Sequence, residues 1–388
     1  MNRRLRFRRH RRGNVVVLTA FFMIGIVASA AFAIDLGYLT VARAELQKSA
    51  DAAAMAAAWE LIDRSAVKGN VNLTEEIYNA RAKAQEYAAA NKVCSNAPSV
   101  DLNHANVEAG DVLVGRLSNP ADPAATMIFN DPNRYNSVRV RIRRTSALNG
   151  EIRLFFARAL GRNSAAAQAE ATAAVIDNFG GFQIPGDGGN LDLLPFALDE
   201  QTWLNLVQNG GGTDQWSYNS TTGAIVGGTD GIREVNLFPQ GTGSPGNRGT
   251  VDIGGSNNST ADIARQILEG VSPDDLEHHG GKLEFDADGE LELNGDTGIS
   301  AGVKDELASI KGQPRIIPIF RTVVGPGNNA QYTIVQFVGV RILDVVLTGK
   351  MSSKRVTIQP APCIVRGGIP ATSEQKSWYV YSPAWLVR

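Results

Sequence analysis

The pattern of apolar and polar positions singles out one segment near the N-terminus. Residues 15–34 form a run of 20 positions without a charge, and only Thr19 and Ser29 among them are polar. A helix of this length rises about 30 Å, the thickness of a bilayer's hydrocarbon core. The run therefore predicts a transmembrane helix, in which every backbone group is hydrogen-bonded within the segment.

The helical pattern continues beyond this run. Small or apolar residues recur at intervals of three or four, and neither glycine nor proline interrupts the chain between Tyr38 and Lys68. We expect one continuous helix that ends near Arg64 and has one packing face. The residues of this packing face are Ala42, Leu46, Ala50, Ala53 and Ala57. The face either receives helices of other proteins, because small side chains let helices approach closely, or seats the helix on its own domain.

Two further elements are predicted before residue 150. Residues 72–92 favour a second helix, with Asn72 and Glu75 as a capping-box variant at its start. Residues 136–145 alternate between aliphatic and arginine side chains, which indicates a strand with one buried face. Its three arginines either form a solvated sheet face, the commoner case, or bind polyanions of the cell envelope.

The second half of the chain predicts little helix and much strand. The glycine-rich stretch at 180–189 favours a turn or boundary, and the glycine density up to residue 256 favours loops and short strands. The exception is 261–270, where helical spacing and a cap at Thr260 predict a helix. The β-rich runs that we expect to build the C-terminal core cover residues 316–320, 332–347 and 356–358.

Together these elements predict the α+β class. A single transmembrane helix continues into a further helical stretch, and a β-rich extracytoplasmic region follows. The expected divisions of the chain are a basic cytoplasmic tail at 1–14, the transmembrane helix at 15–34, an extended helix with an α/β region at 35–180, and a β-rich domain at 181–388.

Charge determines the expected orientation of the apolar helix. Residues 1–12 hold seven arginines and no acid, although the whole chain has a net charge of −1. Such a block also suits a nucleic-acid-binding arm, but the apolar run beside it favours a membrane role and excludes nucleic acid as a partner. Because cationic flanks stay on the cytoplasmic side, we expect everything after Asp35 to lie outside. The arginines nearest the helix are Arg8, Arg9, Arg11 and Arg12.

The composition further limits the class of protein and the kinds of site that it can contain. With 43% hydrophobic and 20% charged residues, the chain is globular rather than disordered. Cys94 and Cys363 are too few for a disulfide scaffold or a four-cysteine zinc site, and a bridge between the two is an open alternative.

No segment carries a recognisable catalytic motif. Residues 284–295 space carboxylates as a calcium loop does, but Glu284 and Gly295 stand where that loop needs Asp and a bidentate Glu. A hairpin is therefore the preferred interpretation, with weak calcium binding as the alternative. His278 and His279 have no nearby partner ligands and favour a surface loop. We expect no enzymatic activity, no cofactor and no metal site.

Three motifs follow one another near the N-terminus. They are Arg-Arg-Gly-Asn at 11–14, Ile-Asp-Leu-Gly at 34–37, and Ala-Arg-Ala-Glu-Leu-Gln-Lys-Ser-Ala-Asp-Ala-Ala-Ala at 42–54. In this order they resemble the TadE/TadG-like Flp (tight adherence) pilus assembly family. Leu-Phe-Phe-Ala-Arg-Ala-Leu-Gly at 154–161 and the alternating alanines at 169–174 resemble later segments of its TadG-like proteins.

The resemblance implies a membrane-anchored accessory or structural protein of a Tad/Flp, type IVb-like pilus system, with a pilin-like helix after the span. It implies the bacterial inner membrane, a cytoplasmic N-terminus and a periplasmic bulk. The implied partners are the lipid bilayer, other pilus assembly proteins or pilin-like helices, and a second copy as a homo-oligomer.

Two alternatives stay open. The first is a secreted or surface binding module, released by signal peptidase after Ala33 within the Ala-Phe-Ala pattern. The helical pattern continues through that site, which favours an uncleaved anchor. The second is a minor pseudopilin, but Leu18 stands where processing after Gly13 needs a glutamate.

Overall fold

The structure is a computed structural model with mixed secondary structure. It is 31% helix and 31% strand, so the predicted α+β class is confirmed. The described residues are 14–69, 72–122, 124–237, 248–255, 259–296, 300–325, 329–350, 353–371 and 377–387. The chain divides into a first unit, residues 1–53, 84–112 and 140–171, and a second unit, residues 54–83, 113–139 and 172–388.

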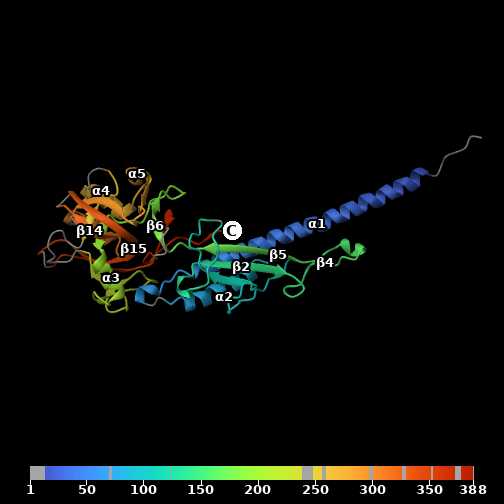
Figure 1. Ribbon diagram of the computed structural model, residues 1–388, viewed down its shortest axis with the longest axis horizontal. Helices are drawn as coiled ribbons and strands as arrows, with labels where there is room; N and C mark the ends of the chain where they lie inside the picture. The colour runs from blue at the N-terminus through green and yellow to red at the C-terminus, as the bar shows by residue number, and fades with distance from the viewer. Residues whose placement is uncertain are drawn as a thin grey trace, which may run out of the picture. The chain divides into compact units, whose positions relative to one another are not determined.

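The N-terminal apolar run belongs to one unbroken helix, α1, which covers Asn14–Trp59 (Figure 1). The predicted continuous helix is therefore confirmed, although it ends at Trp59 rather than at Arg64. The chain after it turns because the Asp63 carboxylate accepts the backbone N–H groups of Ser65 and Ala66 at 2.9 and 2.7 Å. That cap starts the short 3₁₀ helix η1, Ala66–Lys68.

The second predicted helix is α2, Thr74–Ala90. The side-chain oxygen of Asn72 accepts the Thr74 N–H at 3.0 Å, which caps the start of the helix. Ala80, Ala84 and Ala88 form its buried face, whereas Tyr87 is 43% exposed.

Strand β2, Ser137–Arg144, confirms the predicted alternation. Val138, Val140 and Ile142 are fully buried, and the arginines between them are partly exposed. The strand belongs to a four-stranded sheet with the order β1-β2-β5-β20. Its other strands are β1 Val112–Gly115, β5 Ala167–Ala174 and β20 Trp385–Leu386. A separate hairpin in the first unit consists of β3, Ile152–Arg153, and β4, Ser164–Ala165.

The second unit is built on a seven-stranded sheet with the order β10-β16-β15-β13-β11-β7-β14. An added pairing of β14 with β15 closes five of these strands into a ring. The strands are β7 Phe196–Asp199, β10 Val235–Asn236, β11 Arg248–Val251, β13 Leu291–Asp296, β14 Pro314–Val324, β15 Ala330–Val346 and β16 Arg355–Pro360. The three predicted C-terminal runs lie in β14, β15 and β16, so that prediction is confirmed.

Alternate residues of the sheet enter two apolar clusters, one on each face. On β14, Ile317 and Ile319 belong to one cluster, and Ile316 and Phe320 belong to the other. The first cluster also includes residues of α3 Glu200–Gln208, α4 Thr260–Glu269 and α6 Lys304–Ser309. The second includes residues of α5 Pro273–Glu277, β6 Phe179–Gln183 and β12 Lys282–Glu284. Because both faces are covered, β14 is almost continuously apolar.

The remaining elements are short. They are η2 Pro132–Arg134, η3 Ala157–Leu160, β8 Trp216–Tyr218, β9 Ile225–Gly227, η4 Ala301–Val303, β17 Cys363–Ile364, β18 Gly368–Pro370 and β19 Val380–Tyr381. The described residues from 180 to 255 thus form loops and short strands, as predicted, but the helix α3 was not predicted. Its start is marked by Asp199, whose carboxylate accepts the Thr202 N–H at 2.9 Å.

Several local predictions need correction. Gly180 and Gly181 lie inside β6 rather than in a turn. A Cβ on Gly181 would lie 2.0 Å from the Leu283 carbonyl oxygen, so glycine there permits the close approach of β12. The cap of α4 is Ser259 instead of Thr260.

The predicted hairpin around residue 288 is only half right. The turn forms, since the Asp286 N–H donates to the Glu290 carbonyl at 2.8 Å. The flanking strands pair elsewhere, β12 with β6 and β13 with β11 and β15, so no hairpin ladder joins them.

Candidate functional site

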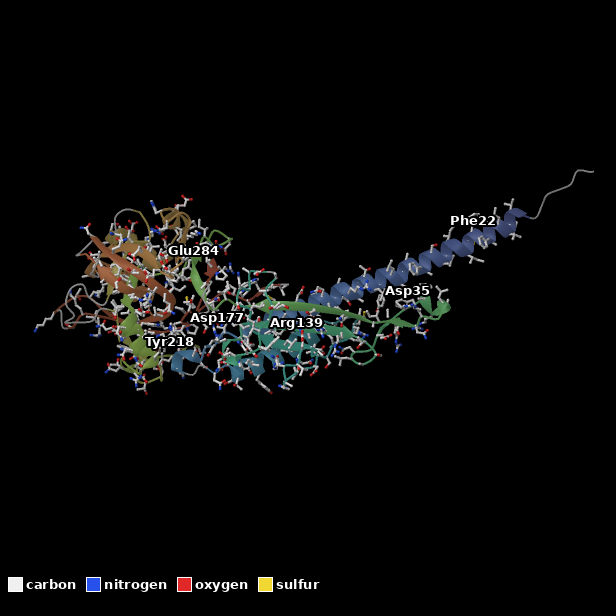
Figure 2. All side chains as sticks on the ribbon, viewed as in Figure 1. Phe22, Asp35, Arg139, Asp177, Tyr218 and Glu284 are labelled. Carbon is white, nitrogen blue, oxygen red and sulfur yellow. The ribbon has the colours of Figure 1, made fainter. Side chains whose placement is uncertain are left out.

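The first half of α1, residues 15–34, is open to its surroundings. Within this segment Phe21 is 73% exposed and Ile24 is 69% exposed, and Figure 2 shows Phe22 on the same open stretch. The most apolar stretch of 18 residues in the helix has a mean hydropathy of 2.5, and none of it is buried by the rest of the chain. The segment is therefore long and apolar enough to cross a membrane.

The hydroxyl groups in this half are satisfied within the helix. Thr19 Oγ1 donates to the Val15 carbonyl at 2.8 Å, and Ser29 Oγ donates to the Gly25 carbonyl at 2.9 Å. Neither hydroxyl of the segment thus needs water or a second chain for a hydrogen bond. The orientation residues Arg8, Arg9, Arg11 and Arg12 lie outside the described residues, so the orientation stays a prediction.

Asp35, the first charged residue after the apolar half, fixes a distant loop to α1. Its carboxylate accepts the backbone N–H groups of Phe155, Phe156 and Ala157 at 2.7, 2.9 and 2.6 Å. These are the free donors at the start of η3, so Asp35 caps η3 from another element. Burial opposes ionisation of this carboxylate, but the three donors and the positive charge of Arg158 outweigh it and hold the pKa of Asp35 below its usual value.

Glu45, ten positions further along α1, holds a second loop. Its Oε2 atom accepts the Cys94 N–H at 2.7 Å. Cys94 and Ser95 have φ angles of 49° and 67°, in the left-handed region that non-glycine residues rarely adopt. The same turn is fastened by Arg144, whose Nη1 donates to the Val93 carbonyl at 3.0 Å. A charged acceptor on α1 thus helps to maintain a strained turn in the first unit.

The predicted packing face lies on the buried side of α1. Ala42, Leu46, Ala50, Ala53 and Ala57 all have zero exposure. Beside them, Ser49 Oγ donates to the Ala88 carbonyl of α2 at 3.2 Å. Burial within the chain fits the alternative in which this face seats the helix on its own domain. The contact with partner helices stays a prediction.

The opposite side of the same stretch is open. Leu36 is 51% exposed and Val41 is 55% exposed. Arg43, Ala44, Gln47 and Lys48 are exposed as well. A partner that reaches α1 after the apolar half meets this mixed polar face.

Two arginines of β2 form ion pairs with carboxylates. Arg141 lies 3.0 Å from Glu170, and Arg143 lies 2.6 Å from Asp111, whose side chain is fully buried. These pairings favour an ion-paired sheet face over a free polyanion site.

The second unit contains a hollow of about 440 Å³ with a mainly apolar lining. Two phenols contribute to it: Tyr379 donates to the Ala66 carbonyl at 3.4 Å, and Tyr381 donates to the Asp63 carbonyl at 3.1 Å. Burial, assisted by the negative charge of Asp63, raises the pKa of both tyrosines, so both remain protonated donors. They hold the turn after α1, and the described lining includes no histidine, cysteine or lysine.

The other chemical candidates are isolated. Within the described ranges no group of three or more His, Cys, Asp or Glu side chains is arranged to hold a metal ion. Cys94 and Cys363 are both free thiols rather than a bridge. Burial raises the pKa of Cys363 to about 12, which keeps it a protonated, unreactive thiol.

Two site residues were not identified from the sequence. Asp35 was used only as a flanking charge and Glu45 was not singled out, because their loop partners are distant in the chain. The usable signal was indirect: both residues stand within the motifs quoted above, as does the Leu-Phe-Phe-Ala segment that Asp35 caps.

Comparison with known families gives two matches. Residues 13–60 match a family model described as putative Flp pilus-assembly TadE/G-like, and residues 56–173 match one described as putative Tad-like Flp pilus-assembly. No curated protein and no solved structure matches the chain. The two matched segments together contain α1, Asp35, Glu45 and the loop at 154–163.

Proposed function

Because residues 13–173 match two family models of Flp pilus-assembly proteins, we propose that this chain acts as a single-pass membrane anchor within the pilus assembly machinery. The observation that carries the proposal is the apolar half of α1, which has no covering partner among the described residues and continues without a break into the half-buried stretch after Asp35. Transfer of an apolar run of this length from water into the hydrocarbon core of a bilayer has a favourable free energy.

The proposed topology has the arginine-rich tail in the cytoplasm and the residues after Asp35 outside. Arg8, Arg9, Arg11 and Arg12 would contact cytoplasmic headgroups, while Asp35 marks the outer end of the span. In a bacterium with two membranes this corresponds to an inner-membrane protein with a periplasmic bulk.

The proposed action is protein–protein contact without catalysis. The exposed face of α1 around Ala44 suits pilin-like helices or other assembly proteins, because it is open while the opposite face is occupied. A second copy of the chain is a further partner that the same surface suits.

Intact mass in cell fractions tests the anchoring. We expect the full-length mass in carbonate-washed membranes, because the span is uncleaved. A shortened soluble product that starts near Ile34 would instead support the secreted binding module, and loss of only the first 13 residues would support the pseudopilin.

Orientation and contact need separate tests. Protease added to intact spheroplasts should digest the residues after Asp35 and leave the tail protected; the reverse pattern refutes the topology. A photo-crosslinking residue at exposed Ala44 should join a pilus protein identified by mass spectrometry, whereas one at buried Ala50 should not. Equal products from both positions would contradict the proposed contact face.

A further inference from the structure

The loop between β3 and β4 exposes three large apolar side chains within six positions. Phe155 is 60% exposed, Phe156 is 47% exposed and Leu160 is 83% exposed. Single exposed apolar residues are common on protein surfaces, but a cluster of this kind indicates a surface that is covered by something else.

The contacts with Asp35 determine the position of this loop along the axis of α1. Three hydrogen bonds of 2.6–2.9 Å hold residues 155–157 at the first position after the apolar half. The ring of Phe155 also packs edge-on against Tyr38, with 5.2 Å between centroids. The loop therefore lies where α1 leaves the hydrocarbon region, and Figure 2 marks Asp35 at that point on the helix.

The charges of the loop suit phospholipid headgroups. Arg153 and Arg158 line a hollow of about 400 Å³ together with Ser164 and Asn163. The one acid in this lining, Glu151, accepts a 2.5 Å hydrogen bond from Ser164 Oγ. Within the described ranges no ion pair involves Arg153, Arg158 or the nearby Arg162, and Arg158 only adds a longer-range positive charge near Asp35. Guanidinium groups are strong ligands for phosphate oxygens.

We propose that residues 153–162 form a membrane foot: Phe155, Phe156 and Leu160 enter the outer interface of the bilayer, and Arg153 and Arg158 bind the phosphate groups of anionic phospholipids. Aromatic rings and arginines are the residues that favour this interface. The inference rests on the proposed anchoring by α1, and it adds a second attachment that fixes the depth and rotation of the helix.

A lipid surface is favoured over a protein partner by position. The exposed residues lie level with the end of a 20-residue apolar run, and the same headgroup layer must surround both. A transmembrane helix alone can rotate about its axis. A loop that is attached to the membrane surface beside the helix would hold it in one rotational orientation.

Tryptophan quenching by brominated lipids tests the foot. The full chain is placed in vesicles of phosphatidylcholine with phosphatidylglycerol, brominated high on the acyl chain, and the wild-type signal is subtracted. Phe156→Trp should be quenched about twofold, because the ring lies at the interface. Phe22→Trp should be quenched by lipids that are brominated near the chain end. Tyr87→Trp is the matched control in the first unit, since Ser49 contacts its neighbour Ala88 about 21 Å beyond Asp35 along α1.

The outcomes separate the two proposals. Quenching at residues 22 and 156 without quenching at 87 supports the foot. Quenching at 22 alone overturns the foot and leaves the anchor intact, whereas no quenching at 22 overturns the anchor itself. Equal quenching at 156 and 87 also overturns the foot, because the whole unit would then lie on the bilayer.

A charge series tests the phosphate ligands. In the Phe156→Trp chain, raising the phosphatidylglycerol fraction should deepen the quenching, and Arg153→Gln with Arg158→Gln should abolish that dependence. Lys48→Gln on the exposed face of α1 should leave it unchanged. The same lipid dependence with and without the two arginines would refute headgroup binding.

Discussion

The two halves of α1 belong to one unbroken helix and have opposite surroundings. In residues 15–34 the large side chains are open on every side, whereas in the second half one face, including Ala42, Ala50 and Ala53, is completely buried in the chain. The first half has Val, Ile and Phe around its whole circumference, and the second alternates small residues with charged ones. A helix that is apolar all round needs a solvent of hydrocarbon, and a helix with a narrow small-residue face needs a protein surface.

Asp35 is the boundary between these halves. It is the first charge after the apolar run, and its carboxylate is occupied by three backbone donors of the first unit. The change of environment along α1 thus coincides with the first tertiary contact of the helix.

The largest expected effect comes from charge in the first half. Phe22→Arg together with Ile26→Arg should cost about 5–7 kcal/mol of insertion free energy, so most of the chain should leave carbonate-washed membranes. The control is Thr40→Arg with Ala44→Arg, the same spacing on the exposed face of the second half, which should leave the chain in the pellet. Equal membrane loss in both variants would erase the distinction between the halves.

An increase in side-chain volume should destabilise the second half of α1 and leave the first half unaffected. Ala50→Leu adds three carbons to a position with zero exposure and should lower the free energy of unfolding of the detergent-solubilised chain by roughly 1–3 kcal/mol. Ala30→Leu in the open half should change it by less than about 0.5 kcal/mol. Denaturant titration gives both values, and a tolerated leucine at position 50 would contradict the buried packing face.

Removing the boundary charge should loosen one loop. Asp35→Asn leaves fewer acceptor sites for three donors, so the amides of residues 155–157 should exchange with solvent about tenfold faster or more. Asp51→Asn on the same helix, which loses only a contact with Gln47, should leave those amides unchanged.

The same contact predicts a pH dependence. Because the pKa of Asp35 is lowered in the folded chain, its contribution is fully present above the ordinary Asp value of about 4 and is lost as pH falls through the lowered pKa. Protection factors of the three amides, corrected for intrinsic exchange, should be constant from pH 7 to about 5 and fall only in stronger acid. A decline near pH 6 would point to another group.

The smallest effect is expected at Glu45. Glu45→Ala removes the charged acceptor from the Cys94 turn, so the thiol should react with maleimide about two- to fivefold faster as the turn opens locally. Cys363 in the same chain is an internal control, since its buried thiol should stay unlabelled. If both cysteines accelerate together, the change is global and the local role of Glu45 is wrong.

Elements whose pattern is repeated along the chain were predictable. The alternation of β2 and the apolar runs of β14, β15 and β16 gave correct strands because burial of one or both faces is visible in sequence spacing. Residues that act through distant partners were not. The pairing of β12 with β6 depends on Gly181 and Leu283, which are about a hundred positions apart, so the turn at Asp286 alone suggested the wrong ladder.

The sequence by itself determined where α1 changes character, the strands β2, β14, β15 and β16, and the resemblance to the Flp pilus-assembly family, since these follow from local composition and order. Only the tertiary structure decided what each face of α1 contacts and what the carboxylates of Asp35 and Glu45 hold. The physical reason is the range of the interactions. Hydrophobic periodicity can be recognised from residues that are close together in the sequence. A carboxylate, in contrast, can accept any N–H group that folding brings within 3 Å of it.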